Sequence, residues 1–388
     1  MSILPTVRRV EDLTVELDVS APVVTLFSGG LDSSHLLFML AERGFRDITA
    51  LVVELGDFVD TENAAALCEQ FGARLEVIDR RAELVSEFVF PAIQAQAIYL
   101  GLHPISSSLT RPLIAREGVR LARQVGAEAI LHTASRSQNT LRRINGAIGT
   151  LGFMGKFGSP YDASAVQRAQ KQFDLKSAGI DLFSDRALSS DCNLWCREFE
   201  SGFLDDPEGF AAPAEFYKWS RADPAAGDQI ISLSFREGIP VALDGEAVGG
   251  IELIDRLNRI AGAFGLGRYS GLEHLDSGAK VLEVREMPAA EVLLRAYRHL
   301  ESATVEAETI REKMALEQIW VREALEGRWF GSLRHAAQAF ISYVRIAVTG
   351  TVMFELSGHG AEVVSIRAER PLYVRSRETW EATSVSAW

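Results

Sequence analysis

Short apolar runs and amphipathic stretches alternate along the first part of the chain. PVVTLF (22–27) and ITALVVEL (48–55) are almost wholly apolar, as is typical of parallel strands covered on both faces. Between them, SSHLLFMLAERG (33–44) carries apolar residues at helical spacing, and Gly44 stands where the end of a helix favours a left-handed residue. This pattern predicts a strand, a turn, a helix and a second strand.

The order of helix and strand then repeats. TENAAALCEQFGARLEVI (61–78) changes from helical spacing to a strand pattern, and so does the stretch from PLIAREG to EAILHTA (112–134). Strands that alternate with helices of this length indicate a parallel, doubly wound sheet. We therefore predict an α/β domain over residues 1–170.

The chain past residue 170 has a different composition and a different pattern of elements. A stretch rich in Pro, Gly and Asp (206–229) is typical of a long surface excursion. The elements predicted after it are a hairpin closed near Glu237 and Gly238, amphipathic helices at 303–326 and 332–346, and a hairpin around SGHG (357–360). We assign residues 171–375 to an α+β domain and 376–388 to a short tail.

Length, composition and charge argue against several classes of protein. The chain has 388 residues, enough for two domains with full cores. Its 40 basic and 53 acidic residues give a net charge of −13, which argues against a nucleic acid as main partner. No apolar run approaches the ~20 residues of a membrane span. The 3 cysteines make no disulfide framework and the start has no export signal, so we expect a cytoplasmic protein.

The stretch TLFSGGLDSS (25–34) joins the first predicted strand to the first helix. Gly29 and Gly30 let the backbone turn tightly, so that successive N–H groups converge on an anion. A helix that begins near Ser33 adds the positive end of its dipole. The stretch contains no lysine, and Asp32 is expected either to cap the helix or to hold a magnesium ion that accompanies phosphates.

Other phosphate-binding motifs are absent. The usual GxxxxGK[ST] loop does not occur, and GFMGKF (152–157) has the wrong glycine spacing and is expected in a mobile loop. SGGLDS after a buried strand resembles instead the loop of ATP pyrophosphatases of the adenine nucleotide alpha-hydrolase-like fold. Those enzymes cleave ATP between its α and β phosphates and adenylate an oxygen of their substrate. The resemblance implies ATP and Mg²⁺ as cofactors.

A longer series of segments resembles argininosuccinate synthase. The series includes FVFPAIQAQAIYLGLHPISSSLTRPLIAREGVRLARQVGAEAILHTASRSQNTLRR (88–143), SSDCNLWCREFESGFLDDP (189–207) and SIRAERPLY (365–373). That family joins citrulline to aspartate: ATP adenylates the ureido oxygen, and the aspartate amine then displaces AMP. The resemblance implies a nucleotide-binding domain, a synthetase domain and amino-acid-like substrates.

The resemblance assigns residues to the site. It implies nucleotide contacts at Phe27, Ser28, Gly29, Gly30, Leu31, Asp32, Ser33, Ser34, Val53, Thr133 and Ser135. It implies substrate contacts at His103, Ser108, Arg111, Ser135, Asn139, Thr140, Arg143, Ser189, Glu198, Glu200, Glu273 and Arg285. Among these, Ser28, Asp32 and Arg143 are the candidate catalytic residues. Asn139 and Arg143 are four apart and are expected to project together from a helix.

Four substrate positions depart from the family. His103 and Arg285 stand in place of tyrosines, Thr140 in place of an aspartate that contacts the incoming amino acid, and Glu198 in place of a serine. RSQ (136–138) also replaces the family's GKG. Unpaired buried charges are costly, so we interpret these changes as altered substrate recognition. The alternative is that Glu198 and Arg285 pair with each other.

The predicted function is therefore an AMP-forming ligase of the argininosuccinate synthase type, with altered substrates in a specialised-metabolite pathway. The alternatives are a genuine argininosuccinate synthase, a sensor that binds ATP or an amino acid, and an RNA-modifying enzyme. The chain ends soon after RPLYVRSRETW (370–380), where the family continues with an arm around a neighbouring subunit. We expect a homo-oligomer, either a dimer or the family's usual tetramer.

Several other residues attract structural interpretations. His132 ends a strand and is expected to pack or hydrogen-bond, not to act as a base. Cys192 and Cys196 lack a second pair and are not expected to bind zinc. Cys68 lies on the apolar face of a predicted helix and is expected in the core. Trp320, Trp329 and Phe330 are expected to lie in the core or at a subunit contact.

Overall fold

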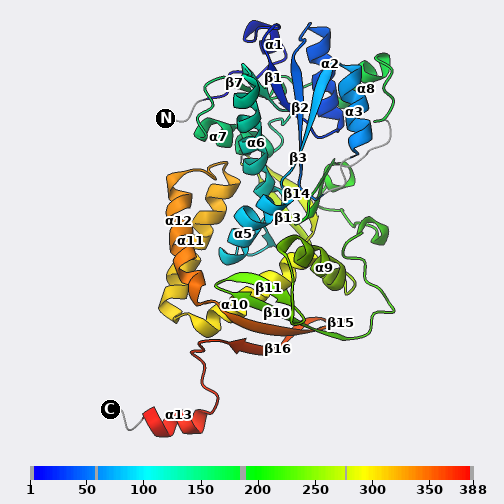
Figure 1. The fold of residues 1–388 in the computed structure, drawn as a ribbon. Coiled ribbons are helices and arrows are strands. Elements are labelled where there is room, and N and C mark those ends of the chain that lie inside the picture. Colours follow the sequence, from blue (N-terminus) through cyan, green and yellow to red (C-terminus); the bar gives the residue numbers. More distant parts are fainter. Residues whose placement is uncertain (1–3, 57–59, 184–188, 276–277, 385–388) are drawn as a thin grey trace.

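A five-stranded parallel sheet forms the upper body of the molecule (Figure 1). It is seen in a computed structural model, which describes residues 4–56, 60–183, 189–275 and 278–384. The strand order is β3-β2-β1-β6-β7. The strands are β1 (Val23–Leu26), β2 (Ile48–Glu54), β3 (Ala73–Asp79), β6 (Ala129–Leu131) and β7 (Lys156–Gly158). All four pairings are parallel, so the predicted sheet is confirmed.

Helices cover both faces of this sheet. One group consists of α2 (Leu31–Glu42), α3 (Thr61–Gln70) and α8 (Arg168–Ser177), and the other of α6 (Thr110–Val125) and α7 (Thr140–Thr150). Successive side chains of a strand point to opposite faces. Val23 therefore joins the core that contains Leu37 of α2, and Val24 joins the core that contains Val119 of α6. Burial on both faces explains the unbroken apolar runs, and the doubly wound arrangement is confirmed.

The GFMGKF segment was predicted to lie in a mobile loop, and that prediction is wrong for its end, Lys156 and Phe157. Its end forms the edge strand β7, and Phe157 is fully buried in the same core as Val24. Gly158, with a φ of +144°, lies against the backbone of Val7, where a Cβ would approach Val7 O to 2.0 Å. Apolar burial and this close approach hold the segment in the sheet.

The predicted domain boundary at residue 170 falls inside α8. This helix packs on α2: His35 Nε2 lies 2.9 Å from Asp174 Oδ2, and Leu175 shares a core with Leu36. The boundary therefore stays a prediction, and the packing favours a division after α8.

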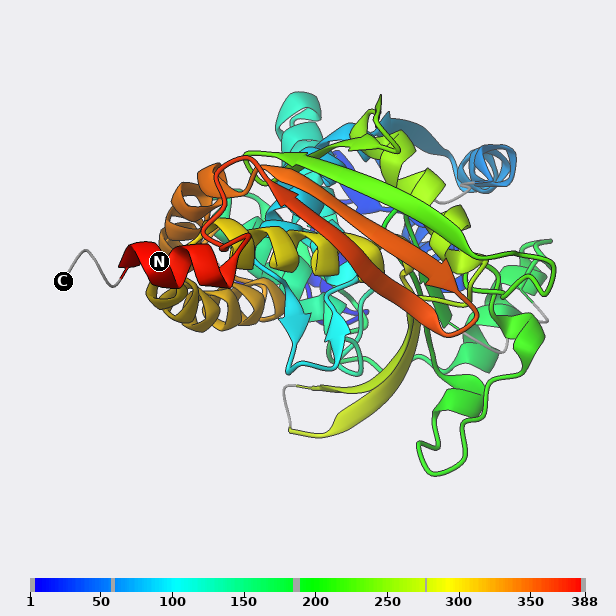
Figure 2. The same ribbon diagram turned by 90° about the horizontal axis from the view of Figure 1, so that it is seen from below.

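An antiparallel sheet and three long helices build the lower body (Figures 1 and 2). The sheet, in the order β12-β11-β10-β15-β16, consists of β10 (Gln229–Arg236), β11 (Ile239–Leu243), β12 (Glu246–Ala247), β15 (Gly350–Ser357) and β16 (Gly360–Ala368). Both predicted hairpins are thereby confirmed. α11 (Ala307–Leu325) and α12 (Ser332–Val344) agree with the predicted helices, and α11 starts four residues later because α10 (Pro288–Thr304) ends there.

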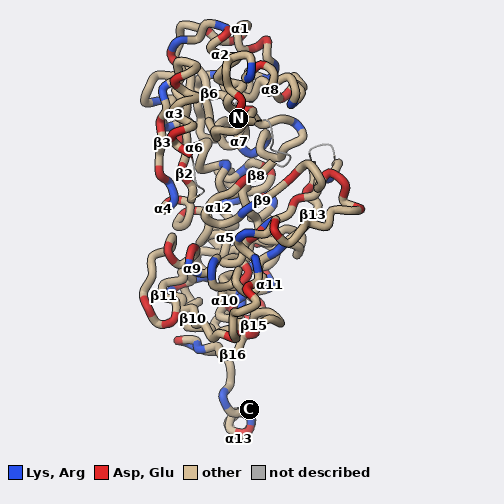
Figure 3. Tube along the Cα trace, turned by 90° about the vertical axis from the view of Figure 1, so that its right-hand side faces the viewer, with Lys and Arg blue, Asp and Glu red and all other residues tan. Residues whose placement is uncertain are grey.

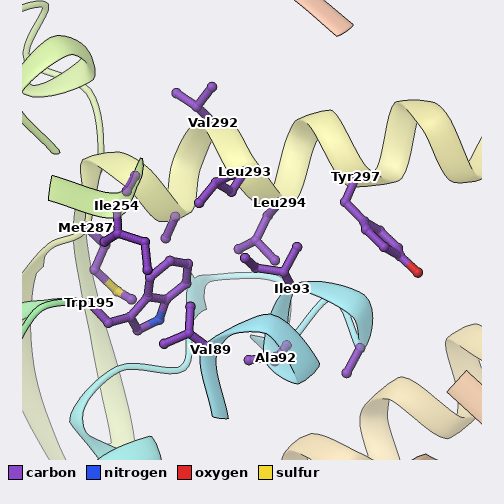
Figure 4. Close-up of a cluster of buried hydrophobic side chains, with 14 of the residues drawn as sticks. Val89, Ala92, Ile93, Trp195, Ile254, Met287, Val292, Leu293, Leu294 and Tyr297 are labelled. Carbon is purple, nitrogen blue, oxygen red and sulfur yellow. The ribbon is translucent and has the colours of Figure 1, made fainter. Parts of the chain in front are cut away.

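α10 carries the core of the lower body (Figure 4). Its side chains Leu293 and Leu294 point toward Val89 and Ile93, and Trp195 packs beside the start of this helix. Burying an aromatic or aliphatic side chain of this size contributes about 1.5–3 kcal/mol. Trp320 and Trp329 are also buried here, which confirms the expectation of a core position.

A third sheet lies between the two bodies (Figure 1). It is antiparallel, in the order β13-β14-β9-β8, and consists of β8 (Ser189–Cys192), β9 (Arg197–Glu200), β13 (Arg268–His274) and β14 (Lys280–Glu286). A ribbon of β4 (Ile98–Tyr99) and β5 (His103–Pro104) contacts β13. This middle layer carries most of the predicted substrate residues.

The remaining elements join these layers, pack within them or extend from them. They are α1 (Asp12–Val15), α4 (Arg81–Glu83), η1 (Leu84–Val89), α5 (Phe90–Gln94), η2 (Ser107–Leu109), η3 (Gly202–Leu204), η4 (Ala214–Phe216), α9 (Gly250–Gly262), η5 (Arg345–Ala347) and α13 (Arg377–Ser384). α13 stands away from the body within the predicted tail, whose last residues, 385–388, lie outside the described part. None of the described helices has the length and apolar character needed to cross a membrane.

Candidate active site

The SGGLDS loop lies at the carboxyl end of the central strand of the parallel sheet. β1 ends at Leu26 and α2 begins at Leu31. The chain passes from β1 to β2 on one side and, after β3, returns to place β6 on the other side of β1, so the strand order reverses here. Open α/β sheets bind ligands at such a switch point, in the crevice outside the carboxyl ends of the strands.

The loop amides have only weak partners. Those of Ser28 and Gly30 donate to Ser33 Oγ and Ser28 Oγ over long distances of 3.4 Å. Gly29 has a φ of +70°, which glycine adopts without strain. Gly30 caps α2 without a side-chain hydrogen bond, and N–H groups in a first helical turn have no partner within the helix. Ser33 Oγ lies 3.1 Å from Gly30 O, to which it donates, and 3.2 Å from Ser28 Oγ. These amides and the helix dipole suit a phosphate.

The other predicted nucleotide residues lie at the same edge of the sheet. Phe27 and Leu31 are buried on either side of the turn, and Val53 lies near the end of β2. Thr133 and Ser135 lie in the segment that follows β6. The topology therefore brings these residues to one edge of the sheet, and their contacts with ATP stay a prediction.

Asp32 does not have the capping role that was one of its two predicted roles. α2 begins at Leu31, two residues earlier than predicted, so Asp32 lies in the first turn of the helix and not at its cap. Its Oδ1 accepts a hydrogen bond of 2.9 Å from Lys171 Nζ on α8. The loop contains no lysine, but a helix about 140 residues further along the chain supplies one.

Asp32 fits the predicted magnesium ion. Its side chain is 42% exposed, and only one of its oxygens accepts from Lys171 among the described residues. Mg²⁺ at phosphate sites is usually held by one or two carboxylates together with phosphate oxygens and water. No group of three or more possible metal ligands occurs in the described part of the chain, and such a site does not need one.

Glu273 joins the predicted substrate residues of the middle layer. Its Oε2 accepts from Asn139 Nδ2 at 2.7 Å and from Arg143 Nη2 at 3.1 Å. The expected joint projection of Asn139 and Arg143 from α7 is thereby confirmed. Arg143 Nε also donates to Leu325 O at 3.0 Å, at the end of α11. Residues of both bodies therefore meet at this carboxylate.

Glu198 and Arg285 do not leave unpaired charges in the pocket. They face each other across β9 and β14, and Arg285 Nη2 lies 3.5 Å from Glu198 Oε1 and 3.4 Å from Glu273 Oε1. Arg285 also pairs with Glu283, and its Nε donates to Ser106 Oγ at 3.0 Å. The argument from unpaired charges is therefore wrong at these two positions, and the alternative, mutual pairing, is confirmed.

The charges of this cluster balance. Burial opposes ionisation of Glu198 and Glu273, but Arg285 and Arg143 lower the pKa of these carboxyls below its usual value. Burial and the neighbouring carboxylates raise the pKa of Glu283 well above its usual value, which favours its protonated form. Two carboxylates thus face two guanidinium groups, which reduces the cost of burying them.

Thr140 and Arg111 lie together on the other side of Asn139. Arg111 Nε donates to Thr140 Oγ1 at 3.1 Å, and the same guanidinium pairs with Asp191 of β8. Glu200 of β9 accepts from Gln138 Nε2 at 3.2 Å, and burial raises its pKa. Ser189 is exposed and pairs with Glu200 across β8 and β9.

His103 presents an acceptor where the family has a tyrosine. Its Nδ1 donates to Pro104 O at 3.1 Å, and burial, followed by the charge of Arg285, lowers its pKa to about 4. The ring is therefore neutral and its Nε2 carries a lone pair. Among the described residues, His103 Nε2, Ser108 Oγ and Arg285 Nη1 are buried without a hydrogen-bond partner. Buried polar atoms without partners are rare in native proteins and fit a ligand site.

Sequence reasoning missed several residues of the site. Glu283 lies two residues before Arg285 and therefore on the same face of β14, a period-two signal that was available. Asp191 follows the predicted Ser189 by two positions in the same way. Lys171 has no local signal, because its partner Asp32 is far away in sequence.

The residues set aside from catalysis have structural contacts. His132 Nε2 lies 2.9 Å from Asn145 Oδ1, and burial lowers its pKa to about 4. Cys68 is buried in the core beside Leu67, as expected, and burial raises its pKa to about 11. Cys196 Sγ accepts from Asn193 Nδ2 at 3.2 Å.

Comparisons with known proteins agree with this architecture. Residues 22–170 match the arginosuccinate synthase N-terminal HUP domain, and residues 188–386 match the arginosuccinate synthase C-terminal domain. Argininosuccinate synthase of Rubrobacter xylanophilus is 35% identical over 366 residues, which cover 93% of this chain and 89% of that protein. The enzyme of Pyrococcus furiosus is 33% identical over 365 residues, which cover 93% and 88%.

Among solved structures, the NH3-dependent NAD synthetase of Campylobacter jejuni is similar at a TM-score of 0.30 and 16% identity, over 43% of this chain and 71% of that chain. A likeness at this level has no bearing on function. The family matches extend over both bodies, and the relatives align over nearly their whole length. The chain therefore belongs to the argininosuccinate synthase family and is an ATP-dependent, AMP-forming carbon–nitrogen ligase.

Proposed function

We propose that this ligase joins citrulline to aspartate and forms argininosuccinate. The observation that carries the proposal is the junction at Glu273, where Asn139 and Arg143 share one carboxylate oxygen. In the family, the equivalents of these two residues contact both amino acids and the ureido group. The relatives named above are argininosuccinate synthases, which favours this substrate pair over the specialised pair predicted from the sequence.

The proposed reaction has two displacements. The ureido oxygen of citrulline attacks the α-phosphorus of ATP, and the bond to the bridging oxygen breaks as pyrophosphate leaves. The amine of aspartate then attacks the ureido carbon, and AMP leaves with the former ureido oxygen. Backbone amides of 28–31 hold the leaving pyrophosphate, and Arg143 orients the ureido group. Asp32 would hold Mg²⁺, which would supply charge neutralisation at the phosphates.

Oxygen labelling tests this proposal. The full chain is incubated with ATP, aspartate and citrulline that carries ¹⁸O in the ureido group, and the AMP is analysed by mass spectrometry. The proposal expects one ¹⁸O in each AMP, with one pyrophosphate released per turnover. Unlabelled AMP, or no product from this pair while ATP still binds, would contradict it.

A related substrate pair is the second candidate. The pairing of Glu198 with Arg285 does not account for the other two residues that differ from the family, Thr140 and His103. Thr140 offers a hydroxyl, already bonded to Arg111, where the family has a carboxylate for the incoming amino acid. His103 offers an acceptor where the family has a phenolic donor. Both changes favour substrates with a different pattern of hydrogen-bond donors, as in a specialised-metabolite pathway.

A substrate panel separates the two candidates. Pyrophosphate release is measured with ureido, amide and carboxylate compounds, each combined with several amines. Turnover with citrulline and aspartate alone would support the first candidate, and turnover with another pair alone would support the second. Binding of ATP without release from any pair would favour the sensor that was weighed from the sequence.

We also propose that the chain works in the cytoplasm as a homo-oligomer, a dimer or a tetramer. The proposal rests on the resemblance to the family, and on α13, which is exposed and stands away from the body. Light scattering of the full chain and of residues 1–375 tests it. A single-chain mass for the full chain would contradict it.

A further inference from the structure

Two contacts fix the position of the lysine that approaches the SGGLDS loop. Lys171 Nζ lies 2.9 Å from Asp32 Oδ1 and 4.2 Å from the centre of the Tyr161 ring. Its side chain is only 10% exposed, whereas that of Asp32 is 42% exposed. Lysine is rarely buried to this degree unless its charge has a partner, so the ammonium is directed at the edge of the loop.

Neighbouring contacts fix the helix that carries this lysine. His35 of α2 lies with its Nε2 2.9 Å from Asp174 Oδ2 of α8 and its Nδ1 2.7 Å from Tyr161 Oη. α2 begins in the loop itself, and α8 lies beside it in two perpendicular views (Figures 1 and 3). The ammonium and the loop are therefore mounted on one rigid unit, which is the condition for a preorganised binding group.

We propose that Lys171 is a phosphate-binding residue of the nucleotide site: it pairs with Asp32 in the empty enzyme and with the β- and γ-phosphates of ATP, and then with pyrophosphate, in the loaded enzyme. The proposal deepens the proposed function and rests on it for the nature of the reaction. An ammonium has three donors, so Lys171 is able to donate to several phosphate oxygens once it has left Asp32.

The exchange of partners has a physical reason. Pyrophosphate carries more negative charge than one carboxylate, and Asp32 is exposed enough to take up a hydrated cation when Lys171 turns away. The loop amides and the helix dipole supply only partial charges. A full positive charge beside them stabilises the leaving pyrophosphate during adenylation, which is the step in which that charge develops.

Direct binding measurements test the proposal without any amino-acid substrate. Calorimetry compares magnesium pyrophosphate and AMP as ligands of the wild type, Lys171→Met, Lys171→Arg and Lys176→Met. Lys176 is the matched control, because it lies on the same helix, is 69% exposed and pairs with Asp181. We expect Lys171→Met to weaken pyrophosphate binding about tenfold or more and to leave AMP binding unchanged. Lys171→Arg should restore part of the loss.

A double-mutant cycle excludes an indirect effect through Asp32. If Lys171 only neutralises that carboxylate, adding Lys171→Met to Asp32→Asn will leave pyrophosphate binding unchanged. If Lys171 binds phosphate, the added substitution will weaken pyrophosphate binding further. Unchanged pyrophosphate binding in Lys171→Met, or equal losses for pyrophosphate and AMP, would overturn the proposal. Failure of every amino-acid pair to turn over would count against the proposed function and leave this result standing.

Discussion

At the scale of single residues, Asp32 is the acidic group of the loop and its charge is predicted to be essential. Asp32→Asn keeps the shape of the side chain and a hydrogen bond to Lys171 but removes the charge that fits a magnesium ion. We expect turnover to fall about 100-fold or more, as is usual when an electrostatic partner of a developing charge is lost. AMP formation from ATP measures it, with Asp181→Asn as an exposed control. Turnover within a factor of two of the wild type would contradict this role.

The pair of Glu198 and Arg285 leads to a second prediction at this scale. Arg285→Tyr alone removes the cation that the carboxylates of Glu198 and Glu273 share and should cost about 3–5 kcal/mol in the free energy of unfolding. Restoring both family residues, as Glu198→Ser with Arg285→Tyr, removes one charge of each sign and should cost much less. Urea unfolding of the three variants measures the difference. Additive losses in the double variant would show that the two residues are not coupled.

The residues that sequence reasoning recovered are those whose evidence is local. Gly29 and Asp32 stand in one short motif, and Asn139 and Arg143 stand one helical turn apart. Lys171 was missed because the fold alone brings it near its partner Asp32. Glu283 was missed although it stands only two residues before its partner Arg285. The pairing of Glu198 with Arg285 was weighed but not favoured, because the register of β9 and β14 is not visible in the sequence.

At the scale of elements, the parallel sheet could be predicted and the middle layer could not. The runs 22–27 and 48–55 are continuous and apolar because both faces of each strand are buried. β7 was missed because only three residues pair and glycines interrupt the pattern. β8 and β9 are short, and most of their side chains are polar because they build the site. Their sequences therefore lack the apolar pattern from which a strand is predicted.

The contact between α7 and the end of α11 provides a prediction about these elements. Gly146 lies against Gly327, and a Cβ on Gly146 would approach Gly327 O to 2.4 Å. Gly146→Ala should therefore push α7 away and weaken the bond from Arg143 Nε to Leu325 O. We expect a higher KM for the ureido substrate with little change in the KM for ATP, measured by pyrophosphate release. Gly209→Ala, where a Cβ meets nothing within 4 Å, is the control.

If the KM for ATP rises as much as the KM for the ureido substrate, the distortion is not confined to α7 and this prediction is wrong. The distinction matters because the nucleotide loop is attached to α2 and α8, whereas Arg143 is attached to α7. We therefore expect the KM for ATP to depend on α2 and α8, and the KM for the ureido substrate to depend on α7.

At the scale of the whole molecule, buried histidines make stability depend on pH. His132 and His103 are buried, and the pKa of each is lowered to about 4 in the folded chain. In an unfolded chain a histidine has a pKa of about 6.5. Between these values the unfolded chain binds more protons, so the free energy of unfolding falls as the pH is lowered from about 6.5 toward 4.

Replacing His132 isolates its share of this effect. Glu198 and Glu273, with lowered pKa values, lose their contribution only below the unfolded pKa of about 4.3, and Glu283, with a raised pKa, acts in the opposite direction at higher pH. These groups are the same in the wild type and in His132→Gln, so they cancel in a comparison.

His132→Gln should be less stable at pH 7.5, because Ala134 N loses its acceptor. The gap should shrink by about 2 kcal/mol at pH 5, since only the wild type binds the extra proton on unfolding. Urea midpoints at the two pH values measure the gap, and a constant gap would mean that His132 keeps an ordinary pKa in the folded chain.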